Sequence, residues 1–83
     1  MRKKIIWNDR AKGELRAIDK PTALRILHAI AHMAYTGEGD IKRLQEIDPP
    51  ECRLRVGDYR VRFHDFGDAL EITGVKHRRE AYR

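Results

Sequence analysis

The first part of the chain alternates between short apolar runs and turn-forming residues. An apolar run at residues 5–7 ends at Asn8, so we expect a brief strand followed by a helix that Asn8 caps. Ala11, Leu15 and Ile18 then recur at helical spacing. This spacing predicts a first helix on the surface, with one narrow apolar stripe.

A second helix is marked by its two ends. Pro21 suits the first helical turn, where its missing N–H is not needed, and Gly37 is a favourable residue for the C-terminal stop. The apolar residues between these ends cover a wide arc of the helix surface. They are Ala23, Leu24, Ile26, Leu27, Ile30, Ala31, Met33, Ala34 and Tyr35. We therefore expect this helix to be buried against both the first helix and a sheet.

The second half of the chain shows two further patterns. In the segment 38–51, glycine, aspartate and proline surround one apolar pair, Ile41 and Leu44, which predicts an ordered loop with at most one helical turn. Beyond this segment apolar and polar side chains alternate, with turn pairs at 57–58 and 66–67. A period of two predicts three strands of a meander.

The order of these elements predicts an α+β fold, β-α-α-β-β-β. Two N-terminal helices would pack on one face of a small antiparallel sheet, and the other face would be open to solvent. The length of 83 residues suits one domain, residues 1–83.

Charge and composition narrow the classes of partner. Eighteen Lys and Arg against 13 Asp and Glu leave a formal net charge of +5, so a polyanion such as nucleic acid is the first partner to consider. The lack of a long uncharged apolar run excludes a membrane span. The basic start has too few apolar residues after it for a secretory signal, and Cys52 has no second cysteine to pair with. We expect a cytoplasmic protein.

Four arginines are predicted to share one face of the sheet. A two-residue turn at 57–58 sets Arg55 opposite Arg60, and Arg53 opposite Arg62. Like charges directly opposed across two strands are destabilising. This arrangement therefore works against the fold unless an anion relieves it.

The two arginine pairs differ in their predicted neighbours. Continuing the register into the last strand sets Arg62 opposite Glu71, so Arg53 and Arg62 fit either a solvated ion-pair cluster or an RNA contact. The same register leaves Arg55 and Arg60 without an acidic residue in their row. Because guanidinium groups match phosphate oxygens bidentately, phosphate binding is favoured for these two.

The C-terminal segment concentrates groups that move protons or bind anions. Lys76 leads into His77, Arg78, Arg79, Tyr82 and Arg83. A histidine exchanges protons near neutrality, and a tyrosine beside positive charge can act as a base. Cleavage of an RNA phosphodiester needs a base for the 2′-OH, cations for the pentavalent phosphate and an acid for the leaving 5′-oxygen. A basic tail that binds without chemistry is the alternative.

Two segments carry a resemblance to a known family. The run RLRVGDYRVRF at 53–63, followed by HRREAY at 77–82, resembles the RelE branch of the RelE/ParE toxin superfamily. The resemblance implies a RelE-like fold and the toxin of a type II toxin–antitoxin system. Such a toxin enters the ribosomal A site and cleaves mRNA there as a metal-independent endoribonuclease without a cofactor, and a cognate antitoxin holds it inactive. The implied partners are the antitoxin, the ribosome and mRNA, with no membrane.

The resemblance also implies roles for single residues. Arg60 would stabilise the transition-state phosphate, Arg53 would contact the RNA, and Arg78 is the basic residue of the terminal motif. Tyr82 would be the general base or a stacking platform, and His77 a proton-transfer group. The candidate catalytic residues are Arg60, His77, Arg78 and Tyr82. The candidate RNA- and phosphate-binding residues are Arg53, Arg55, Arg62, Lys76, Arg79 and Arg83.

Other residues leave two alternatives open. Glu51 stands where the family has a basic residue, which weakens phosphate binding. The alternatives are a ParE-like toxin that poisons DNA gyrase, and a silent member that only binds antitoxin or nucleic acid. His28 and His32 lack a supporting acid or thiol, so no metal site is expected. We expect His64 to lie on the face opposite Arg60.

Overall fold

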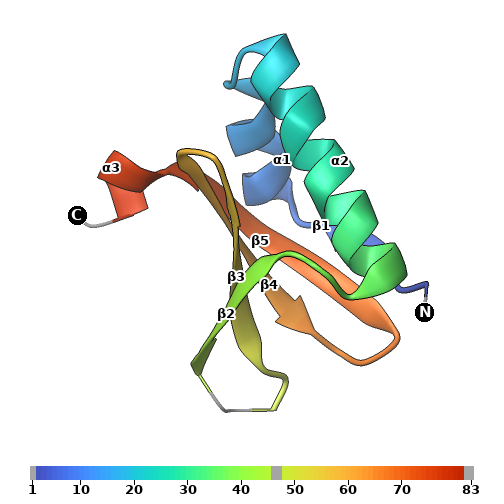
Figure 1. The fold of residues 1–83 in the computed structure, drawn as a ribbon. Helices are drawn as coiled ribbons and strands as arrows, with labels where there is room; N and C mark the ends of the chain where they lie inside the picture. Colours follow the sequence, from blue (N-terminus) through green and yellow to red (C-terminus); the bar gives the residue numbers. More distant parts are fainter. Residues whose placement is uncertain (1, 46–47, 82–83) are drawn as a thin grey trace.

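Five strands form one sheet, and two helices cover one of its faces (Figure 1). The computed structural model describes residues 2–45 and 48–81. Its strands are β1 (Lys4–Trp7), β2 (Asp40–Gln45), β3 (Glu51–Val56), β4 (Tyr59–Asp65) and β5 (Ala69–His77). Its helices are α1 (Asp9–Arg16), α2 (Lys20–Thr36) and α3 (Arg78–Ala81). This confirms the predicted α+β fold with the helices ahead of most strands.

The sheet differs from the predicted one in two places. Its strand order is β1-β5-β4-β3-β2, and β1 pairs with β5 in parallel, so the sheet is mixed and not wholly antiparallel. The predicted loop at 38–51 is wrong, because β2 occupies part of it and pairs with β3. As an edge strand β2 is exposed along most of its length, and it therefore lacks the apolar alternation that marks a buried strand.

The helix ends match their predicted signals. The Asn8 side chain accepts a hydrogen bond from the Ala11 N–H at 2.8 Å and caps α1. Gly37 ends α2 in the left-handed conformation, with φ of 80°, and its N–H donates to the Met33 carbonyl. Local sequence chemistry therefore determines where α1 begins and where α2 ends.

The core lies between α2 and the sheet, and the apolar arc of α2 is narrower than expected. On this helix the buried side chains are Ile26, Ile30, Met33 and Ala34, which form one stripe. Leu24, Leu27 and Tyr35 are exposed, so the predicted burial of α2 on two sides is wrong. The reason is that α1 packs mainly against β5. The sheet contributes Cys52, Leu54, Val56, Val61, Phe63, Leu70, Ile72 and Val75.

The burial of one face of α2 leads to a stability test. Ile26→Ala removes a fully buried side chain and is expected to lower the free energy of unfolding by about 2–5 kcal/mol. Leu24→Ala, on the same helix but 48% exposed, is the matched control and should change it by less than about 1 kcal/mol. Urea unfolding measures both. Equal losses would contradict the one-sided packing of α2.

Candidate functional site

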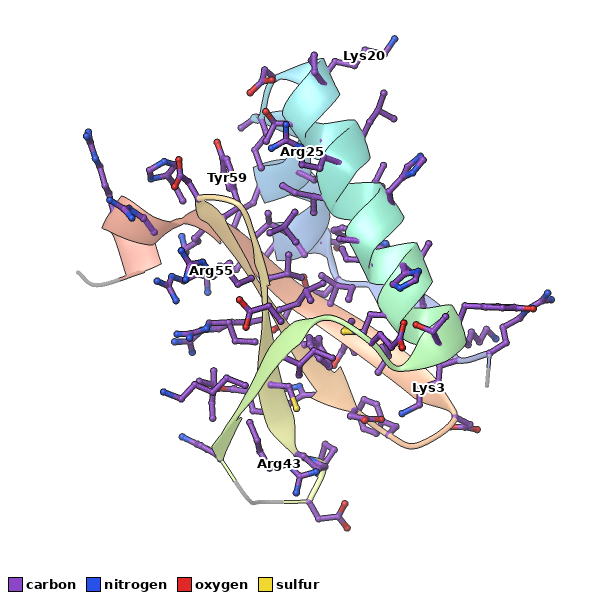
Figure 2. The ribbon with its side chains drawn as sticks, viewed as in Figure 1. Lys3, Lys20, Arg25, Arg43, Arg55 and Tyr59 are labelled. Atoms are coloured by element: carbon purple, nitrogen blue, oxygen red, sulfur yellow. The ribbon has the colours of Figure 1, made fainter. Side chains whose placement is uncertain are left out.

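The sheet face away from the helices carries the predicted arginines. Arg55 lies opposite Arg60 and Arg53 opposite Arg62, as expected for a turn at 57–58. Their neighbours along β3 and β4 are buried beneath the helices, so the four arginines lie on the other face. Figure 2 shows Arg55 pointing away from α2. We call Arg53, Arg55, Arg60 and Arg62, with the sheet surface that they cover, the arginine face.

The row nearest the β3–β4 turn is basic, as is the next row, where Lys42 of β2 lies opposite Arg53. Lys76 of β5 lies opposite Arg60, and Asp40 of β2 lies opposite Arg55. The prediction that this row contains no acidic residue and that Thr73 faces Arg60 is therefore wrong. Arg55 is exposed, and its Nε donates to the Gly57 carbonyl at 3.4 Å. Three cations and one carboxylate share this row.

A bulge and a longer connection than predicted together explain the wrong register in β5. Phe63 pairs with Ile72 and Arg62 with Gly74, which leaves Thr73 as the extra residue. The Thr73 hydroxyl donates to the Arg62 carbonyl at 3.3 Å. The connection between β4 and β5 is also longer than the predicted 66–67 turn, because the pairing ends with Asp65 opposite Leu70. Glu71 consequently faces a different residue from the predicted Arg62.

A second row of charges, acidic in character, lies at the other end of the arginine face. His64 is opposite Glu51 on one side and Glu71 on the other. The His64 Nε2 is 3.6 Å from Glu51 Oε2, and its Nδ1 is 3.7 Å from Glu71 Oε1. The placement of His64 on the opposite face was wrong, because every second residue of β4 points the same way. We call Glu51, His64 and Glu71 the acidic row.

Glu51 connects the acidic row to the arginines. Its Oε1 lies 3.4 Å from Nη1 of Arg62, so Arg62 has a carboxylate partner, as the sequence suggested, but from Glu51 and not from Glu71. Glu51, which stands where the family has a basic residue, therefore forms an ion pair with one residue of the arginine face. The pair is solvent-exposed on the arginine side, so its contribution to stability is small.

The terminal segment starts beside the arginine face. The Arg78 N–H donates to the Asp58 carbonyl at 2.7 Å, which ties α3 to the β3–β4 turn. Arg78 and Arg79 are exposed. Tyr82 and Arg83 lie outside the described residues. The structure thus brings Arg78 and Arg79 to the same end of the sheet as Arg55 and Arg60 (Figure 1).

His77 lies on the helix side of the sheet. It is opposite Tyr59 in the β4–β5 register, and the two rings meet edge to face with centroids 5.2 Å apart. Its Nδ1 accepts a hydrogen bond from the Arg79 N–H at 3.2 Å. His77 pairs with Tyr59, the residue next to Arg60, so the side chains of His77 and Arg60 point to opposite faces of the sheet.

Glu14 is a residue of this region that the sequence pattern did not reveal. Glu14 lies on α1 and contacts the part of β5 that β1 does not pair with. Its Oε1 accepts the Val75 N–H at 2.9 Å, and its Oε2 lies 2.9 Å from Nζ of Lys76. Burial alone would raise the pKa of Glu14, but the hydrogen bonds from Lys76 and Val75 outweigh it and hold the pKa below its ordinary value. The sequence shows only the i,i+4 pair with Arg10. Glu14 holds the ammonium of Lys76 at the sheet edge.

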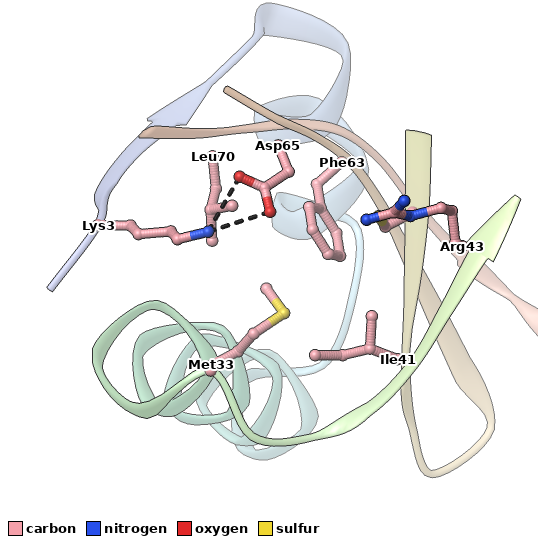
Figure 3. Close-up of a pocket in the computed structure, with 9 residues that line it drawn as sticks. Lys3, Met33, Ile41, Arg43, Phe63, Asp65 and Leu70 are labelled. Atoms are coloured by element: carbon pink, nitrogen blue, oxygen red, sulfur yellow. Dashed lines mark hydrogen bonds and ion pairs between the residues drawn. The ribbon is translucent and has the colours of Figure 1, made fainter. Parts of the chain in front are cut away.

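A pocket lies on the helix side of the sheet (Figure 3). Its volume is about 290 Å³, and it is lined by Lys3, Met33, Gly37, Ile41, Arg43, Cys52, Phe63, Asp65 and Leu70. Lys3 Nζ contacts both carboxylate oxygens of Asp65 at 3.0 Å. Burial would raise the pKa of Asp65, but the Gly67 N–H and Lys3 hold it below its ordinary value. No residue of the predicted site lines this pocket.

Two classes of feature are missing from residues 2–45 and 48–81. No group of three or more His, Cys, Asp or Glu side chains there could hold a metal ion. No helix in this part of the chain has the length and apolar character required to cross a membrane.

Comparison with known families identifies the arrangement. The family model for the ParE toxin of the type II toxin–antitoxin system parDE matches residues 5–82. The chain belongs to this toxin family. The match spans the helices, the arginine face and the terminal segment, and it confirms the RelE/ParE superfamily membership inferred from the two sequence segments. A search of the curated proteins found no match.

Solved structures show the same fold for this ParE-family chain. A chain of the archaeal RelE–RelB complex from Pyrococcus horikoshii OT3 aligns with a TM-score of 0.79 and 21% identity, over 94% of this chain and 97% of that one. For the RelB–RelE antitoxin–toxin complex from Methanococcus jannaschii the values are 0.75, 22%, 93% and 94%. For the toxin–antitoxin complex RelBE2 from Mycobacterium tuberculosis they are 0.76, 16%, 93% and 99%. At these identities the likeness concerns the fold.

The contacts of Glu14 lead to a pH-dependent stability test. Because its folded pKa is lowered, Glu14 stabilises the fold fully above its unfolded pKa of about 4.3, and this stabilisation is lost as the pH falls through the folded pKa. Glu14→Gln should therefore lower the free energy of unfolding by about 1 kcal/mol at neutral pH, and by less in acid. Urea unfolding from pH 7 down to about pH 2 measures the difference.

The control for this test is Glu38→Gln. Glu38 is highly exposed, and its substitution should change stability by less than about 0.5 kcal/mol at either end of the pH range. A loss in Glu14→Gln that is as large in acid as at neutrality would show that its charge is not involved.

Proposed function

We propose that this toxin cleaves messenger RNA in the ribosomal A site and so inhibits translation, acting in the cytoplasm. The observation that carries the proposal is the arginine face, where Arg55, Arg60 and Lys76 stand in one row at the β3–β4 turn. Asp40 and Glu51 offset part of the repulsion between the opposed arginines, but cations still outnumber carboxylates on this face, and a bound phosphate relieves the rest. The RelE-like fold and the two sequence segments that resemble RelE support the same reading.

The proposed reaction is an internal transesterification. The 2′-oxygen of a ribose forms a bond to the adjacent phosphorus, and the bond from phosphorus to the 5′-oxygen breaks. The proton of the 2′-OH goes to a base, and an acid protonates the leaving 5′-oxygen. Arg60 and Arg55 stabilise the charge that develops on the pentavalent phosphate.

The proton-transfer groups in this proposal come from the terminal segment. His77 points to the helix side and its Nδ1 already accepts a backbone hydrogen bond. Tyr82 is therefore the first choice for the base, with the cations of Arg78 and Arg79 nearby in sequence to favour its ionised form. Arg83 and Arg53 complete the set of proposed RNA contacts.

A cognate antitoxin is the second proposed partner. The three solved structures described above are antitoxin–toxin complexes, and the matching family is that of the toxin of a type II toxin–antitoxin system. The proposal is that the antitoxin holds this toxin inactive until it is removed.

A gyrase poison is the competing function, because the matching family is that of the ParE toxin. Such a toxin would use the same fold to bind a protein, without RNA chemistry of its own. The arginine face would then be a protein-binding or solvated surface.

Cleavage of a defined messenger separates these functions. In a reconstituted translation system, the wild type should produce new 5′ ends within A-site codons, detected by primer extension. Arg60→Ala should lower the cleavage rate about a hundred-fold or more, because it removes a donor to the transition state. Tyr82→Phe should also lose cleavage if Tyr82 is the base.

The matched control is Arg16→Ala, which removes an exposed arginine from the last turn of α1. It should cleave at the wild-type rate. If the messenger stays intact while the toxin inhibits purified gyrase, the proposed nuclease function is wrong and the gyrase-poison function takes its place. Intact messenger with no inhibition of either would favour a silent binder.

Binding of single-stranded RNA gives a second test of the arginine face. Each phosphate contact contributes about 0.7 to the slope of log affinity against log salt concentration for a single strand. Arg55→Ala should therefore reduce the slope by about 0.7, while Arg16→Ala leaves it unchanged. Fluorescence anisotropy at several salt concentrations measures both. An unchanged slope in Arg55→Ala would mean that Arg55 contacts no phosphate.

A further inference from the structure

The acidic row adjoins exposed apolar side chains. The ring of Phe66 lies 6.4 Å from that of His64, inclined at 68°, and Phe66 is 52% exposed. Ile6 of β1 lies opposite Glu71 and is 44% exposed. One end of the sheet therefore combines carboxylates, an imidazole and an open aromatic ring.

This combination matches the chemistry of a nucleic-acid base and repels a phosphate. Carboxylate oxygens accept hydrogen bonds from the amino groups on base edges, and aromatic rings stack on base faces. The negative charge of Glu51 and Glu71 disfavours a second phosphate at this end. A strand of RNA on this surface would thus bring its phosphates to the arginines and a base to the acidic row.

The spacing of the two surfaces suits one nucleotide. Successive residues on one face of a strand are about 6.6 Å apart, so His64 is one such step beyond Arg62 on β4. Glu51 contacts both of these residues, at 3.4 Å and 3.6 Å. A phosphate held by Arg53 and Arg62 therefore has the acidic row within reach of its own base.

We propose that the acidic row and Phe66 form a base-reading site at the end of the arginine face, which selects bases with an exocyclic amino group over uracil. Adenine, cytosine and guanine each present an amino donor to a carboxylate, whereas uracil has a carbonyl oxygen, which a carboxylate repels, in place of the cytosine amino group. Glu51 and Glu71 act as specificity-determining residues, and Phe66 provides the stacking surface. The inference rests on the proposed RNA-binding function and adds the identity of the base.

A basic, apolar peptide is the other occupant that this chemistry would fit. RNA is favoured because the acidic row is continuous with the arginine face, through the contact between Glu51 and Arg62. A peptide that covered both surfaces would meet opposite charges one step apart along the same strand.

Cytosine and uracil test the proposal most directly, because they have the same size and differ in the amino group. Binding of 2′-O-methyl oligo(C) and oligo(U), which resist cleavage, is measured by fluorescence anisotropy. The wild type should bind oligo(C) about five-fold or more tighter than oligo(U). The double variant Glu51→Gln with Glu71→Gln should lose this preference, and Phe66→Ala should weaken both oligonucleotides about five-fold or more.

Glu38→Gln is the matched control, since it removes an exposed carboxylate away from this surface. It should keep the preference for oligo(C). The preference is the decisive quantity, because a purely structural role of the acidic row would change both affinities together. Circular dichroism confirms that each variant is folded.

The other outcomes separate this inference from the proposed function. Equal binding of both oligonucleotides by the wild type, with the salt slope still dependent on Arg55, would overturn the base-reading site alone. No binding of either would overturn the RNA-binding function together with the site. Binding of a synthetic amphipathic Lys–Leu peptide that depends on Glu51 and Glu71, with no preference between the oligonucleotides, would replace the base by a protein partner.

Discussion

The register of the β3–β4 hairpin is the constraint on which the rest of the structure depends. Side chains alternate between the two faces of a strand, so a slip of one residue would bury Arg53, Arg55, Arg60 and Arg62 and expose the core. The buried partners of the hairpin, such as Leu54 opposite Val61, hold the register from the helix side. The same register sets the arginines in opposed pairs. The core thus stabilises an arrangement of charges that repel one another.

Charge changes sign along the arginine face. The row at the β3–β4 turn is basic, the next row contains Lys42, Arg53 and Arg62, and the acidic row follows one step further along β4. Glu51 and Glu14 act at the two ends of this face: one contacts Arg62 and His64, and the other holds Lys76. A surface with this polarity orients an asymmetric polyanion, whereas a uniformly basic surface would bind it in either direction. This is the physical link between the fold and the proposed action on RNA.

Much of the candidate site could be predicted from the sequence because it is local. The turn at 57–58 and the alternation on either side of it are sufficient to pair Arg55 with Arg60. The register of β5 could not be extended in the same way, since the bulge at Thr73 and the longer connection between Asp65 and Leu70 have no clear local signal. The position of His77 on the helix side follows from that register. The predicted face of His64 was wrong because His64 is an alternate residue of β4 with Arg60 and Arg62 and so shares their face, where it pairs with Glu51.

The sequence by itself determined the helix caps, the hairpin and the sharing of one face by the arginines, because each depends on neighbours a few residues apart. Only the tertiary structure decided the parallel pairing of β1 with β5, the edge position of β2 and the role of Glu14 at the end of β5. These features join segments far apart in the chain, and β2 in particular has little apolar alternation to mark it. They exist because unsatisfied strand edges find partners once the core has formed.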